Sequence, residues 1–133
     1  LTIKKCHAVQ GTKIISAKLS INAKNERLTI KLAKKIKGKA KLCIEFTGIL
    51  NDRLLGFYKS QYKDKKGKTK YLATTQFEAA DARRAFPCWD EPAVKATFDV
   101  SLLVDKHLGA ISNMPVTSEK NVGSKILYKF GRT

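Results

Sequence analysis

The chain has 133 residues, of which 43% are hydrophobic and three are proline, so it is long enough for one domain with a modest core and too short for two. Lysine and arginine number 27 against 11 aspartates and glutamates, which gives a formal net charge of +16. No apolar run is long enough to cross a membrane as a helix.

The positive charge leaves one class of function open, a non-enzymatic basic module that binds an acidic partner or nucleic acid, because clustered cations release counterions from a polyanion. The lysines alternate with apolar residues along predicted strands, however, and no arginine-rich or aromatic-interleaved recognition segment is present. This pattern favours lysines on the solvent face of a sheet, where they also discourage edge pairing.

Three cysteines, Cys6, Cys43 and Cys88, stand at wide spacings without a CxxC pair, and the two histidines, His7 and His107, are far apart. The sequence therefore predicts neither a zinc knuckle nor a disulfide framework. Free thiols are typical of a reducing compartment, so we expect a cytoplasmic protein.

The first half of the chain shows the two-residue period of half-buried strands. Apolar and polar residues alternate from Ile15 to Ile21, and after a turn at 23–26 the alternation resumes from Leu28 to Leu32. Beyond a turn at Gly38, Leu42, Ile44 and Phe46 define the buried face of another strand. No helix-length connection separates these strands, which indicates an antiparallel sheet.

Residues 48–56 break the alternation, with a turn at Asn51 and Asp52 that neighbouring leucines are expected to cover. Residues 56–62 and 70–77 then form a predicted hairpin, whose charged tip at 64–68 contains a glycine. Residues 98–104, 110–112 and 125–130 supply the last predicted strands, and short helical turns are expected near 81–85 and 94. The pattern predicts an all-β domain of about eight antiparallel strands, either a two-layer β-sandwich or one strongly curved sheet.

The stretch from Thr74 to Phe98, TTQFEAADARRAFPCWDEPAVKATF, carries the chemistry. Gln76 and Glu78 lie two apart where a strand ends, so in extended chain they point to the same side. Charged and aromatic residues follow, and carboxylates that accept from guanidinium groups under aromatic cover make a self-locking corner. We therefore expect Arg83 or Arg84 to pair with one of the nearby acids, and Phe86 and Trp89 to be largely buried. The acids are Asp81, Asp90 and Glu91.

This stretch closely resembles part of the N-terminal domain of the zinc aminopeptidases related to aminopeptidase N, puromycin-sensitive aminopeptidase and the tricorn-interacting aminopeptidases. The likeness extends upstream through FTGILNDRLLGFYKSQY and downstream through SNMPV. It implies a saddle-like N-terminal β domain, truncated at both ends, in which residues 1–133 are a single domain fragment. It also implies a thermolysin-like catalytic domain that this sequence does not contain, and hence missing strands and an exposed apolar surface or unpaired strand edge.

The resemblance implies a zinc-dependent aminopeptidase that removes amino-terminal residues from peptides. Its HExxH zinc motif is absent here, so no catalytic residue and no metal ligand is expected in this segment, and the fragment alone should bind no zinc and be inactive. The implied partners are the enzyme's own catalytic domain and peptides with a free amino terminus, with no membrane; nucleic acid is not favoured.

The resemblance assigns Glu78 as the anchor of the substrate ammonium and Gln76 to the pocket of the first side chain. It also implies a cis bond between Glu78 and Ala79. From the residues alone, the favoured interpretation of Gln76 and Glu78 is a strand-end hydrogen-bonding pair. A hydrolase that uses Glu78 with Asp90 or Glu91 as a carboxylate pair is a further alternative. An anchor should lie exposed at the rim of the sheet, outside any internal salt bridge.

Overall fold

The computed structural model of the protein describes residues 1–133 and contains nine strands, one short 3-10 helix and no α-helix. Every pairing between these strands is antiparallel, and they form three open sheets, so the all-β prediction is confirmed. The chain divides into two compact units, Leu1–Pro92 and Ala93–Thr133. The assignment of residues 1–133 to a single domain stays a prediction.

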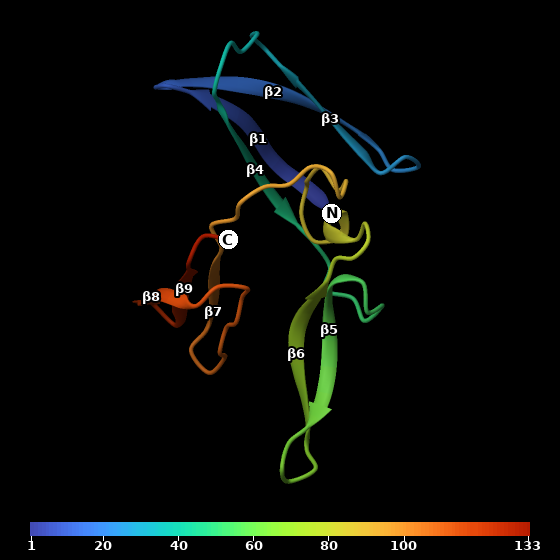
Figure 1. Ribbon diagram of the computed structural model, residues 1–133, viewed down its shortest axis with the longest axis vertical. Coiled ribbons are helices and arrows are strands. Elements are labelled where there is room, and N and C mark those ends of the chain that lie inside the picture. The colour runs from blue at the N-terminus through green and yellow to red at the C-terminus, as the bar shows by residue number, and fades with distance from the viewer. The chain divides into compact units, whose positions relative to one another are not determined.

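The first unit contains a four-stranded sheet in the order β3-β2-β1-β4, drawn from blue to green in Figure 1. Its strands are β1 (Thr2–Gln10), β2 (Lys13–Asn22), β3 (Arg27–Leu32) and β4 (Lys41–Thr47). The predicted hairpin is β2–β3, and its turn includes Glu26 at a φ of 52°. Strand β1 was not predicted: its pairing with β4 shifts between Ile3 and Lys5, and this irregularity interrupts the two-residue period that marks a strand.

The two faces of this sheet differ in character. The register places Ala8, Ile15 and Leu42 opposite one another on one face, which the apolar side chains of β3 continue. His7, Ser16 and Cys43 lie opposite one another on the other face, which is polar. Only Ala8 and Ile15 on the apolar face are buried, and Ile21 on the same face is 59% exposed. The expected exposed apolar surface is therefore present.

A two-stranded hairpin follows, made of β5 (Gly56–Lys63) and β6 (Thr69–Gln76), as the alternation predicted. At its tip, the Asp64 carboxylate accepts hydrogen bonds from the backbone N–H groups of Lys66 and Lys68, and Gly67 has a φ of 75°. The preceding turn is anchored by Asn51, whose side-chain oxygen accepts from the Arg53 N–H. The leucines of this turn were expected to be covered but are exposed, because no other segment packs on them. They are Leu50, Leu54 and Leu55.

The second unit is a three-stranded sheet in the order β7-β9-β8, made of β7 (Ser101–Asp105), β8 (Val116–Val122) and β9 (Lys125–Phe130). Phe130 is its buried side chain. The strand predicted at 110–112 is wrong: the chain forms β8 after the bend instead, and every residue of β8 is exposed. A strand with two wet faces has no hydrophobic period by which to recognise it.

Candidate functional site

The candidate anchor residues lie where β6 ends. Gln76 is the last residue of that strand and pairs with Gly56 of β5. Phe77 turns towards Phe86, and the two rings meet edge to face with centroids 5.8 Å apart. Glu78 follows, exposed, and the Glu78–Ala79 peptide bond is cis as expected. Neither the Gln76 amide nor the Glu78 carboxylate takes part in a side-chain hydrogen bond or ion pair, so both are available to a ligand.

The chain then folds into the predicted corner through a 3-10 helix, η1 (Ala82–Arg84). Arg83 is its central residue. Its backbone N–H and its Nε both donate to Asp90 Oδ2, at 3.1 and 2.9 Å, and its Nη2 donates to the Asp90 carbonyl at 3.3 Å. The Asp90 side chain is only 11% exposed. The expected arginine–carboxylate pairing is therefore confirmed.

Two further contacts extend the corner. Arg83 Nη1 donates to Glu26 Oε2 at 3.2 Å, which ties the corner to the turn between β2 and β3. Arg84 Nε donates to Asp81 Oδ1. Glu91, the third acid expected as a partner, is exposed and makes no such contact.

Gly56 allows the corner to approach the hairpin closely. Its φ is 73°, a left-handed conformation that glycine adopts without steric cost. A Cβ at this position would lie 2.6 Å from the Arg84 Cβ and 3.2 Å from the Asp81 carbonyl oxygen. Only glycine therefore lets η1 pack against the start of β5.

The charges in the corner stabilise one another. Burial alone would raise the pKa of the Asp90 carboxyl, but the hydrogen bonds and positive charge of Arg83 outweigh burial and hold that pKa below its ordinary value. The bonds to Asp90 and Glu26 raise the pKa of Arg83, and the bond to Asp81 raises that of Arg84. Asp90 is thus held by a cation, which weighs against its pairing with Glu78 as a catalytic carboxylate.

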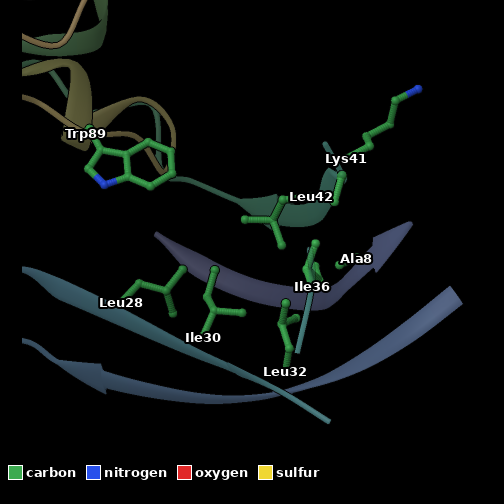
Figure 2. Close-up of a pocket in the computed structure, with 9 residues that line it drawn as sticks. Ala8, Leu28, Ile30, Leu32, Ile36, Lys41, Leu42 and Trp89 are labelled. Atoms are coloured by element: carbon green, nitrogen blue, oxygen red, sulfur yellow. The ribbon is translucent and has the colours of Figure 1, made fainter. Parts of the chain in front are cut away.

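The predicted burial of Trp89 is wrong, because its side chain is 79% exposed. Phe86 is half-buried. The indole does not cover the ion pairs. It lies at one end of an apolar groove of about 370 Å³ on the sheet, shown in Figure 2, whose other walls include Leu28, Ile30, Ile36 and Leu42. This groove was not predicted, although the alternation of Leu28, Ile30 and Leu32 places three apolar side chains on one face of β3.

Metal ligands do not gather anywhere in residues 1–133: no three His, Cys, Asp or Glu side chains come together as a possible metal site. His7 lies in the first unit and His107 in the second. All three cysteines are free. No helix in the structure has the length and apolar character needed to cross a membrane.

Comparison with known proteins agrees with this architecture. The family model for the Peptidase M1 N-terminal domain matches residues 1–133. Puromycin-sensitive aminopeptidase of Caenorhabditis elegans is 55% identical over 105 residues, covering 78% of this chain and 11% of the relative. Alanine/arginine aminopeptidase of Saccharomyces cerevisiae is 60% identical over 81 residues, covering 60% of this chain and 10% of the relative. The matched part is about a tenth of these relatives, and the chain belongs to the Peptidase M1 N-terminal domain family.

Proposed function

We propose that this domain anchors the free amino terminus of a peptide in a zinc-dependent aminopeptidase. Glu78 binds the ammonium, and Gln76 lines the pocket of the first side chain. One observation supports the assignment above others: Glu78 is an exposed carboxylate without a partner just after the end of β6, two positions from the exposed Gln76, whereas Asp81 and Asp90 are each held by an arginine. An enzyme that removes one residue at a time must fix the end of its substrate, and a carboxylate holds an ammonium by charge-assisted hydrogen bonds.

The corner supplies the rigidity that such an anchor needs. Glu78 makes no polar contact of its own, so its position depends on the chain on either side. Phe77 before it packs on Phe86, and the Asp81 N–H after it donates to the Phe77 carbonyl at 2.9 Å. A carboxylate held by its backbone keeps all its acceptor capacity for the ligand.

Hydrolysis and zinc binding are assigned to the remainder of the intact enzyme. Residues 1–133 bring no metal-ligand set together, so we assign the zinc ligands to other parts of the intact chain. The relatives' names support the class of reaction, since each is an aminopeptidase. In this proposal the domain's partners are its own catalytic domain and peptides with a free amino terminus, in the cytoplasm.

The experiment compares Glu78→Gln with the wild-type intact enzyme, because glutamine keeps the size and removes the charge. We expect KM for a free-amine peptide to rise and kcat to fall, with a loss in kcat/KM of about 100-fold, as a misplaced substrate typically costs. The wild-type enzyme should bind the free-amine peptide more tightly than its des-amino analogue when the two are compared as competitive inhibitors. In Glu78→Gln the ratio of the two inhibition constants should move towards one. This second measurement reports ammonium recognition directly.

The matched control is Glu91→Gln, since Glu91 is the other acid of this segment without a partner. It should leave kcat/KM unchanged. Cleavage by Glu78→Gln at the wild-type rate would refute the anchor. Equal losses in both variants would show that the general charge of the segment matters and not an anchor at Glu78.

A further inference from the structure

The apolar groove on the four-stranded sheet has a basic rim that the anchor function leaves unexplained. Its floor is formed by Leu28, Ile30 and Leu32 of β3 together with Ala8 and Leu42. Figure 2 shows these aliphatic side chains directed into one space. Trp89, 79% exposed, stands at one end of this space.

The loop between β3 and β4 carries the rim. It folds back over the sheet so that Ile36 lines the groove, and the Gln10 amide holds it by donating to the Lys37 carbonyl at 2.6 Å. Five exposed lysines lie on either side of Ile36 in the sequence, and none of them forms an ion pair. Figure 2 shows the side chain of Lys41 extending away from the groove. No acidic residue occurs from position 27 to 44. The lysines are Lys34, Lys35, Lys37, Lys39 and Lys41.

We infer that this groove binds an extended, acidic segment of the same enzyme from outside residues 1–133, with apolar side chains in the groove and carboxylates against the rim. Charge complementarity selects the acidic character, because unpaired lysines beside an apolar site attract carboxylates and repel cations. A second copy of this domain is a poor occupant, since its net charge of +16 and its own basic rim would face the same lysines.

The size of the groove favours a tethered occupant. A volume of about 370 Å³ accepts only a few side chains. A segment of the same polypeptide binds at a high effective concentration and so needs few contacts. The 105 matched residues are 11% of the nematode relative, so most of such a chain lies outside this domain. This step rests on the proposed function, which makes the domain part of a longer enzyme.

The test is photo-crosslinking in the intact protein with p-benzoylphenylalanine in place of Trp89, an exposed position where an aromatic is already tolerated. The matched control carries the same probe at Lys31, whose side chain lies on the opposite face of the sheet. We expect a strong crosslink from position 89, within one polypeptide, to a segment that contains both apolar and acidic residues. The Lys31 probe should give none to that segment.

A second pair of variants tests the rim. Lys34→Glu with Lys35→Glu should reduce the crosslink from position 89 severalfold, whereas Lys65→Glu with Lys66→Glu, an adjacent pair at the tip of the β5–β6 hairpin, should leave it unchanged. Crosslinks between two copies, to lipid, to another protein, or to a segment without carboxylates would overturn the inference, as would a yield no higher than that from Lys31. The crosslink is independent of activity, so it and the kinetics of Glu78→Gln can fail separately.

Discussion

Two groups of carboxylates within fourteen positions of the chain differ in what surrounds them. Asp81 and Asp90 are each held by an arginine and are largely shielded from solvent. Glu78, which precedes them, and Glu91, which follows, are exposed and have no partner. Acidic residues in one stretch therefore differ in role: the paired acids, Asp81 and Asp90, build the corner, and Glu78 lies on the chain that leads into it.

The variant with the largest expected effect on stability is Arg83→Ala in the intact enzyme. It removes the side-chain contacts to Asp90 and to Glu26, and leaves the Asp90 carboxylate without its cation. We expect Tm to fall by several degrees in differential scanning fluorimetry. Arg83→Lys should recover little of the loss, because an ammonium cannot reproduce the guanidinium fork. The Tm of Arg84→Ala, which loses a single side-chain partner, should fall less. Equal losses of Tm in Arg83→Ala and Arg84→Ala would contradict the central place of Arg83.

Gly56→Ala is expected to have the next largest effect, because it would force η1 away from β5. Its control is Gly67→Ala at the hairpin tip, where φ is nearly the same, 75° against 73°, and where a Cβ would meet nothing within 4 Å. The control should cost about 1–2 kcal/mol, the usual penalty of a left-handed conformation for a residue with a Cβ. Gly56→Ala should cost more and should also reduce kcat/KM. Equal costs would show that the corner does not depend on this close approach.

A smaller effect is expected from pH. The pKa of Asp90 is lowered in the folded state, so its stabilising contribution is fully present above the ordinary aspartate value and is lost as the pH falls through the lower folded value. The difference in Tm between wild type and Asp90→Asn should therefore stay constant from about pH 8 to about pH 5 and shrink below about pH 4. A difference that grows on acidification would contradict this assignment.

The smallest effect on stability is expected at Glu78. Glu78→Gln should leave Tm within about half a degree of the wild type, because an exposed carboxylate without a partner contributes little to stability. A large fall in Tm would show that Glu78 has a structural partner in the intact enzyme, and would place it with Asp81 and Asp90.

Much of the fold could be predicted because residues 15–32 and 56–77 show the two-residue period of extended chain, broken only at their turns. Strand β1 could not be found in this way, since the shift between Ile3 and Lys5 breaks the period. The chemistry of the corner was predictable as a class, arginines beside acids. The particular bond from Arg83 to Glu26 was not, because it joins positions 57 apart that only the fold brings together. The burial of Trp89 was predicted wrongly, because the burial of a side chain depends on which other segment packs over it, and the local sequence does not contain that information.

The bond between Arg83 and Glu26 also bears on the order in which this unit folds. Most strand pairs here join neighbours in the sequence, and such hairpins form within about 1–10 μs. A contact between residues 26 and 83 must instead close a long loop, and loop-closure entropy delays it until the sheet already exists. We therefore expect the segment that carries Glu78 to become ordered late, after the β2–β3 hairpin has fixed its turn.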